Sequence, residues 1–283
     1  MPAAAGLVRS GAAVTWVVDP KWAPLLTDMP GVSVWGMNRR SLASLRDTYE
    51  HLRSQSFTAA YDFQGLIKSG LVVRASRARR RVGFAAAYLR ERPAAWFYTE
   101  HVNPAGVHVV EHNMSLAAVE GPAEFPLPEG AAVVPGLPER PYILASARAG
   151  WAAKEWPQEN YPALAEKLRE RGLELVMNRP EWSLLQLVMA TRRAAAVVGL
   201  DSGPMHLAAA LRKPGVALFG PTSPERNGPY GGSMIVLRDA AARTTYKRVQ
   251  EISPSMRALT VERVWQALAR CLDISFPNLT PTQ

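Results

Sequence analysis

The chain has 283 residues, 48% of them hydrophobic, so it can bury one large core or two of ordinary size. A single cysteine, Cys271, excludes an internal disulfide framework and fits a reducing compartment. The net charge of +9 favours anionic partners: nucleic acid, anionic lipid or phosphorylated small molecules. We find no apolar run long enough to span a bilayer, no signal-peptide pattern, and no Cys/His spacing typical of zinc sites.

In the first half, short apolar runs alternate with helical patterns. Strands are predicted at residues 12–18, 32–35, 59–63 and 81–84, and helices at 40–54, from 65 onward and at 113–118. Asp19 and Pro20 open an additional helical turn after the first strand. The helix at 40–54 carries Leu42, Leu45, Tyr49 and Leu52 at helical spacing.

The middle of the chain is rich in proline. Residues 121–130 and 135–141 contain prolines at a density that stops regular elements. These stretches are the best linker candidate, and we place the domain boundary between residues 135 and 136. The first domain is then residues 1–135 and the second is residues 136–283.

The second half restarts the alternation. Strands are predicted at 141–146, 174–177, 195–200, 216–219 and 234–237, and helices at 157–172, 183–191, 205–211 and 260–272. In the last helix Thr260 is the predicted N-cap, and Val261, Val264, Leu268 and Cys271 face inward. Alternating strands and helices indicate parallel sheets covered on both faces. The fold class is therefore α/β, with two Rossmann-like doubly wound domains facing a cleft.

Residues 199–211 predict a site for a phosphate group. The apolar run 195–200 is followed by Asp201 or Ser202 as a helix N-cap, and Pro204 suits the first helical turn. The unpaired amides and the dipole of a helix N-terminus attract anions, and Gly203 lets a ligand approach the backbone. His206 lies one turn further on. The same Gly-Pro start also occurs in α/β proteins without any ligand.

A second loop could complete this site. Residues 146–157 combine Ser146, small residues and Lys154 before a helix, so they can offer amides, a hydroxyl and an ammonium to a diphosphate. Ser146, Asp201 and Gly220 each follow a predicted strand, and the carboxyl ends of parallel strands share one edge of a sheet. Lys154 as an ordinary surface lysine and His206 as a satisfied buried histidine remain the alternatives. No Ser-His-Asp arrangement for nucleophilic catalysis can be assembled.

Basic residues crowd one part of the first half, namely Lys68, Arg74, Arg77, Arg79, Arg80, Arg81, Arg90 and Arg92. This density favours a surface for a strongly anionic partner over a solvated helix end and loop. Aromatic residues are not interleaved with these arginines as they are in platforms that stack single-stranded bases. Nucleic acid is therefore not the expected partner.

These residues resemble a known family. Residues 201–211, 217–226 and 228–231 resemble the signature of the bacterial lipopolysaccharide heptosyltransferases, glycosyltransferase family 9. Residues 61–69, 81–84, 90–98 and 108–113 resemble heptosyltransferase I in order and spacing. The resemblance covers nearly the whole chain and implies the GT-B fold, which consists of two Rossmann-like domains.

The resemblance also implies a reaction, which is an inverting transfer of heptose from ADP-heptose to a Kdo-bearing lipid A. It implies no metal and no further cofactor, a peripheral location at the cytoplasmic face of the inner membrane, and a monomer. Lys154 matches the lysine that stabilises the leaving diphosphate, and Asp201 the aspartate that holds the heptose hydroxyls. Ser146, Ser202, Gly203 and His206 complete the donor site, whereas Lys68, Arg79, Arg80 and Arg81 fall on the acceptor side.

Two parts of the family pattern are absent from this sequence. The family begins with a strand and a Ser-x-Gly-Asp loop whose aspartate is the proposed catalytic base, and here residues 1–4 match the end of that motif. A loop, helix and strand are also missing near residues 176–181, and Glu181 does not replace the acidic residue that contacts the nucleoside. Omitted disordered residues, a misassigned start codon, or a truncated or degenerate gene would explain these gaps. The alternatives to an active heptosyltransferase are a catalytically impaired or non-catalytic remnant that binds sugar nucleotide or lipid A, and a related GT-B enzyme with another donor sugar.

Overall fold

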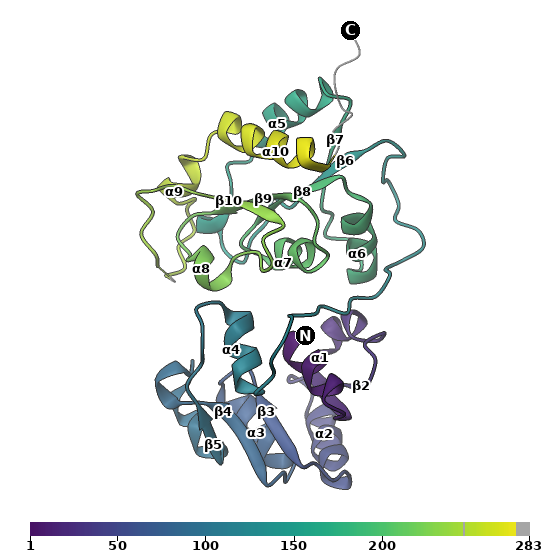
Figure 1. The fold of residues 1–283 in the computed structure, drawn as a ribbon, viewed down its shortest axis with the longest axis vertical. Helices are drawn as coiled ribbons and strands as arrows, with labels where there is room; N and C mark the ends of the chain where they lie inside the picture. The colour runs from purple at the N-terminus through teal and green to yellow at the C-terminus, as the bar shows by residue number, and fades with distance from the viewer. Residues whose placement is uncertain (246, 276–283) are drawn as a thin grey trace. The chain divides into compact units, whose positions relative to one another are not determined.

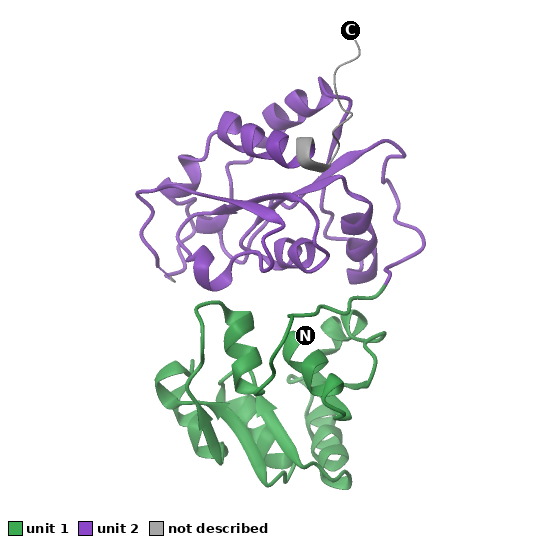
Figure 2. Cartoon of the chain, viewed as in Figure 1, with its two compact units in different colours: residues 1–128 green, residues 129–283 purple. Residues whose placement is uncertain are grey.

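The computed structural model describes residues 1–245 and 247–275. The chain divides into two compact units, the first ending at Pro128 and the second beginning at Glu129 (Figure 2). The sequence placed this boundary after residue 135, within the same proline-rich segment. No helix among the described residues is long and apolar enough to cross a membrane.

Unit 1 contains short parallel strands joined by helices (Figure 1). Its elements in chain order are α1 (Pro2–Arg9), β1 (Val14–Val18), η1 (Pro20–Leu25), β2 (Val32–Gly36), α2 (Leu42–Ser54), β3 (Ala59–Asp62), α3 (Ile67–Ala75), β4 (Arg80–Phe84), η2 (Ala86–Tyr88), η3 (Arg92–Phe97), β5 (Glu100–Val102) and α4 (Val109–Leu116). The sequence missed α1 and β5, and it placed the helix at 113–118 several residues too late.

The strands of unit 1 form two sheets instead of one. Strands β1 and β2 pair in parallel, and β3, β4 and β5 form a separate parallel sheet in that order. Each sheet has its own core, built around Leu26 and Met29 in the first and around Val82 and Tyr98 in the second. Strands β1 and β3 are both edge strands of their sheets. Unit 1 therefore departs from the single doubly wound sheet that the alternation predicted.

Helix α2 exposes most of the apolar residues whose spacing predicted it. Leu52 is buried, but Leu42 is 84% exposed and Leu45 and Tyr49 are exposed as well. Spacing alone cannot show whether a stripe faces a core or solvent, because both faces of a short helix repeat with the same period. The outer side of α2 is therefore an unpartnered apolar surface.

Unit 2 is a doubly wound domain with one five-stranded parallel sheet in the order β10-β9-β8-β6-β7. Its elements are β6 (Tyr142–Ala145), η4 (Ala152–Lys154), α5 (Asn160–Arg169), β7 (Glu174–Met177), α6 (Leu184–Arg193), β8 (Ala196–Leu200), α7 (Gly203–Ala210), β9 (Gly215–Phe219), α8 (Pro224–Asn227), β10 (Met234–Arg238), α9 (Pro254–Arg257) and α10 (Val261–Ser275). All the strands and long helices predicted for the second half are present.

Helices cover both faces of this sheet (Figure 1). Helices α5 and α10 pack on one face through a core that includes Trp156, Leu164 and Leu268, and α6 and α7 pack on the other. Alternate residues of each central strand point to opposite cores, so Val198 and Val197 belong to different ones. Cys271 is buried in the first core, and this burial raises the pKa of its thiol. The capping hydrogen bond of Thr260, to the amide of Arg263, is formed at 3.3 Å.

Trp156 provides a test of this packing. The side chain is fully buried, its Nε1 donates a 2.6 Å hydrogen bond to the Leu259 carbonyl, and its ring meets the edge of Tyr161. We expect Trp156→Ala to lower the free energy of unfolding of unit 2 by about 3–5 kcal/mol, as large-to-small core substitutions do. Thermal and urea unfolding would measure this loss.

The matched control is Trp96→Ala, since Trp96 is 85% exposed. It should change the unfolding free energy of the protein by less than about 0.5 kcal/mol. Equal losses in the two variants would contradict the packing described here.

Candidate functional site

Three neighbouring strands of unit 2 end in the residues that the sequence singled out. Ser146 follows β6, Asp201 follows β8 and Gly220 follows β9, and β8 lies between the other two strands. The backbone amide of Ser146 bonds the Val198 carbonyl at 3.2 Å, which ties this residue to the central strand. The prediction that the three positions share one edge of the sheet is confirmed.

Asp201 and Lys154 form a buried ion pair at this edge. Lys154 Nζ lies 2.5 Å from Asp201 Oδ2 and 3.4 Å from the Asp201 carbonyl oxygen. Only 9% of Lys154 and 8% of Asp201 is exposed. Thr222, in the loop after β9, donates a 2.6 Å hydrogen bond to the same carboxylate oxygen. An ammonium and a hydroxyl therefore hold one carboxylate between two strand ends.

The aromatic ring of Trp151 covers the lysine. Lys154 Nζ lies 3.9 Å from the ring centroid, and the guanidinium of Arg248 lies 5.4 Å from the same centroid. Cations at these distances are attracted to the ring face. The ammonium of Lys154 is thus oriented by the ring and the carboxylate together.

Helix α7 begins next to this pair. Ser202 is its N-cap residue and Pro204 lies in its first turn, as the sequence predicted. The predicted capping hydrogen bond is wrong: the Ser202 hydroxyl donates to the Leu200 carbonyl, and the Asp201 carboxylate is occupied by Lys154 and Thr222. No side chain caps the first turn, so its amides stay available to an anion.

The surface over the start of α7 is open. Gly203 is exposed, and a Cβ atom built on it would have no neighbour within 4 Å. His206 is exposed one turn further along the helix. A ligand can therefore approach the backbone of α7 where the helix dipole is positive.

In unit 1, Asp62 organises the loop after β3. Its Oδ1 accepts the amides of Gln64 and Gly65, and its Oδ2 accepts the hydroxyls of Ser69 and Tyr98, all within 3.2 Å. Burial and the bond to Asp62 raise the pKa of Tyr98, so the phenol stays a donor at neutral pH. Each carboxylate oxygen already accepts two hydrogen bonds, which assigns Asp62 to shaping this loop and not to proton transfer.

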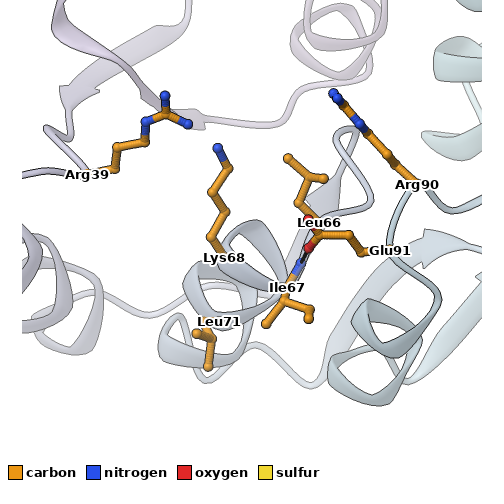
Figure 3. Close-up of a pocket in the computed structure, with 7 residues that line it drawn as sticks. All are labelled: Arg39, Leu66, Ile67, Lys68, Leu71, Arg90 and Glu91. Atoms are coloured by element: carbon orange, nitrogen blue, oxygen red, sulfur yellow. Dashed lines mark hydrogen bonds between the residues drawn. The ribbon is translucent and has the colours of Figure 1, made fainter. Parts of the chain in front are cut away.

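The start of α3, next to this loop, presents Lys68 to a basic pocket of about 450 Å³ (Figure 3). The side chains of Arg39, Lys68 and Arg90 extend to the same side of α3, and none of them has an ion-pair partner within the described ranges. Glu91 caps α3 instead, because its carboxylate accepts the amide of Ile67 at 2.8 Å. We call this set the Arg39–Lys68–Arg90 pocket.

The other predicted acceptor residues lie elsewhere. Arg79, Arg80 and Arg81 are at the amino end of β4, whereas Lys68 follows the carboxyl end of the parallel neighbour β3, so the structure does not bring them together. Arg80 pairs with Glu100 at 2.8 Å, and the Arg81 side chain donates to the carbonyls of Phe97 and Ala78. These basic residues are close in sequence but separated in space, because α3 carries the chain from Lys68 back to the amino end of β4.

Sequence reasoning missed several residues of these sites. Thr222 lies in a loop that was noted for its pattern, but its hydrogen bond to Asp201 depends on the order of the strands. Arg90 was noted in the basic run but not assigned to the acceptor site, and Arg39 lies outside that run.

Glu181 is exposed in the short turn from β7 to α6. Among the described residues, no group of three or more His, Cys, Asp or Glu side chains is placed to hold a metal ion.

Comparison with known proteins identifies the family. The sequence profile described as glycosyltransferase family 9 (heptosyltransferase) matches residues 45–180 and 179–256. The two matched stretches overlap at residues 179–180, next to Glu181. A lipopolysaccharide heptosyltransferase 1 from Pseudomonas aeruginosa is 28% identical over an alignment of 281 residues, gaps included, that covers 84% of this chain and 79% of that protein.

Solved structures show the same fold. Escherichia coli ADP-heptose lps heptosyltransferase II has a TM-score of 0.75 at 23% identity, covering 96% of this chain and 93% of that one. The Escherichia coli heptosyltransferase WaaC with ADP also has a TM-score of 0.75 at 23% identity, covering 95% of this chain and 94% of that one. These likenesses confirm the GT-B fold class. The chain belongs to glycosyltransferase family 9, the heptosyltransferases, and is a glycosyl-transferring enzyme.

Proposed function

We propose that this protein transfers heptose from ADP-heptose to a Kdo-bearing lipid A in the assembly of the lipopolysaccharide inner core. The observation that carries the proposal is the Lys154–Asp201 pair beside the uncapped start of α7. A buried cation and free helix amides suit a diphosphate, and a carboxylate within reach suits sugar hydroxyls. The names of the relatives support the same donor and pathway.

Donor binding requires the ion pair to exchange partners. Lys154 now faces the Asp201 carboxylate, and its ammonium would turn toward the diphosphate when the donor enters. Asp201 would then accept hydrogen bonds from the heptose hydroxyls while Thr222 still holds one carboxylate oxygen. Ser146, Ser202, Gly203 and His206 line the same edge and the helix start, which supports their assignment to the donor site.

The reaction is an inverting displacement. An acceptor hydroxyl attacks the anomeric carbon as the bond from that carbon to the diphosphate oxygen breaks, and the hydroxyl proton leaves with a base. Lys154 and the first amides of α7 stabilise the negative charge that grows on the departing ADP. These groups can supply the positive charge that the step needs, so we propose a mechanism without a metal ion.

The Arg39–Lys68–Arg90 pocket supports an anionic acceptor. Three cations on one side of α3, which form no ion pair with any residue that the structure describes, fit the phosphate and carboxylate groups of a Kdo-bearing lipid A. Because this acceptor is a membrane lipid, we place the enzyme at the cytoplasmic face of the inner membrane as a peripheral protein. We propose that it acts as a monomer.

Asp201→Ala tests the donor site. Without the carboxylate, the heptose hydroxyls lose their acceptor while Lys154 stays free for the diphosphate, so ADP should bind about as well as before. The affinity for ADP-heptose should fall roughly tenfold or more, since hydrogen bonds to charged groups contribute about 1.5–3 kcal/mol. Calorimetric titration with both ligands measures the difference.

Glu170→Ala, at the exposed end of α5, is the matched control and should leave both affinities unchanged. Unchanged ADP-heptose affinity in Asp201→Ala would remove Asp201 from the donor site. Binding of the donor without any transfer would favour the non-catalytic alternative, and a preference for another ADP-sugar would favour a different donor.

Thr222→Val tests the support of Asp201. Valine keeps the shape of threonine but removes the hydroxyl that donates to Oδ2, so the carboxylate loses one orienting bond. We expect ADP-heptose affinity to fall by roughly tenfold, and Thr222→Ser to restore most of it. The same titration measures both variants. Equal ADP-heptose affinities in Thr222→Val and Thr222→Ser would show that the hydroxyl has no role.

Lys68→Met tests the acceptor site. Removing one of three converging cations should raise the KM for a Kdo-lipid A acceptor by about tenfold and leave ADP-heptose binding unchanged. Arg79→Met is the control, because Arg79 lies at the opposite end of the sheet and should leave KM near its original value. A steady-state transfer assay with EDTA present compares them.

A larger rise in KM for Arg79→Met than for Lys68→Met would restore the assignment of the acceptor site to the arginines at the start of β4. A requirement for added Mg²⁺ in this assay would contradict the metal-independent mechanism.

A further inference from the structure

Six of the ten large apolar residues that unit 1 exposes lie on three connected elements, and the other four are Trp22, Phe63, Tyr88 and Val107. Helix α2 exposes Leu42, Leu45 and Tyr49, α3 exposes Ile67 and Leu71, and η3 exposes Trp96. Helix α3 contacts both α2 and η3, and Gly70 of α3 packs closely on Phe97 of η3. Single exposed apolar side chains are ordinary, but several of them on adjoining elements indicate an interaction surface. We call it the α2–α3–η3 face.

The charge of this face has one dominant sign. Helix α3 and η3 carry Lys68, Arg74 and Arg92 and contain no acidic residue. On α2, Arg46 is balanced by Glu50 at 2.7 Å, and Arg53 lies over the ring of Tyr49. Asp47 and Glu50 offset Arg46 and Arg53 on α2, so the excess positive charge of the face comes from α3 and η3.

More cations lie at both ends of the helices. The Arg39–Lys68–Arg90 pocket is at the start of α3, and a second hollow of about 640 Å³ beyond the helix ends is lined by Arg53, Arg77 and Arg79. The side chains of Arg77 and Arg79 have no hydrogen-bond or ion-pair partner in the part of the chain that the structure describes. The whole face has an apolar middle and basic ends.

We infer that the α2–α3–η3 face docks on an anionic lipid bilayer. Leucine and isoleucine side chains gain free energy on entering the acyl region, tryptophan prefers the interface, and arginines and lysine are drawn to anionic headgroups. A uniformly negative surface matches cations spread along the whole face, and a fluid bilayer meets them without a complementary shape. The inference rests on the membrane location proposed above but not on the transfer chemistry.

This docking would serve the proposed acceptor site. Lys68 belongs both to the face and to the Arg39–Lys68–Arg90 pocket, so a lipid headgroup beside the docked enzyme would meet the pocket cations first. The acceptor would then need to move only its headgroup region toward the enzyme. The apolar stripe of α2, which contributes little to the core, thereby gains a role in positioning.

Vesicle flotation of the full chain tests the inference. We expect binding to vesicles of equal parts phosphatidylglycerol and phosphatidylcholine, little binding to phosphatidylcholine alone, and release at high salt, because surface charge attraction is screened. Lipids brominated near the headgroup should quench the fluorescence of Trp96. Trp96→Phe should lose this quenching, whereas Trp22→Phe, which changes an exposed tryptophan of η1 outside the face, should retain it.

Substitutions separate the apolar and basic contributions. Leu42→Ser with Leu71→Ser, and independently Arg74→Glu, should each weaken vesicle binding roughly tenfold. Arg257→Glu, an exposed arginine of unit 2, is the control for net charge and should have little effect. Unchanged binding in the face variants would overturn the inference. A wild-type dimer in sedimentation that Trp96→Ala converts to a monomer would overturn it in favour of a second copy of this chain.

The outcome is distinguishable from failure of the proposed function. Titration with ADP-heptose uses no membrane, so the face variants should bind the donor as the wild type does. Normal donor binding without vesicle binding would reject the docking face alone. Vesicle binding that needs the face, without any heptose transfer, would reject the proposed reaction and leave the docking face standing.

Discussion

The ion pair between Lys154 and Asp201 is the contact on which the candidate donor site depends. Two charges with less than a tenth of their surface exposed need close partners, and here they have each other, the Thr222 hydroxyl and the ring of Trp151. The central strand β8 brings the carboxylate to the sheet edge, and η4 brings the ammonium to it. Any displacement of these elements would leave a buried charge unpaired.

The two units present their cations in different ways. Lys154 is buried and already paired, so an anion must replace the carboxylate as its partner. Arg39, Lys68 and Arg90 are exposed, and none of them forms an ion pair with a described residue. The first arrangement favours a ligand that offers both a diphosphate and hydroxyls, since these satisfy lysine and aspartate together. The second accepts any anion of suitable reach, which suits a large lipid headgroup.

Unit 1 combines two small sheets with an outer surface that is not buried. Asp62 stabilises it locally, because its four hydrogen bonds tie the loop after β3 to the start of α3 and to Tyr98. Helix α2 buries Leu52 and Thr48 but exposes Leu42. The same elements thus provide both a hydrogen-bonded loop and an apolar, basic face, and Lys68 belongs to the face and to the pocket beside the loop.

The sequence by itself determined the α/β alternation and the strands and long helices of unit 2, because strand periodicity and helix-start residues are local signals. Its motifs also carried the family resemblance, from which the expected roles of Lys154 and Asp201 came. Only the tertiary structure decided which residues meet. The order β9-β8-β6 brought Thr222 to Asp201, and the reversal of the chain through α3 separated Lys68 from Arg79, Arg80 and Arg81. It also left the stripe of α2 exposed, since periodicity specifies a face of a helix but not what covers it.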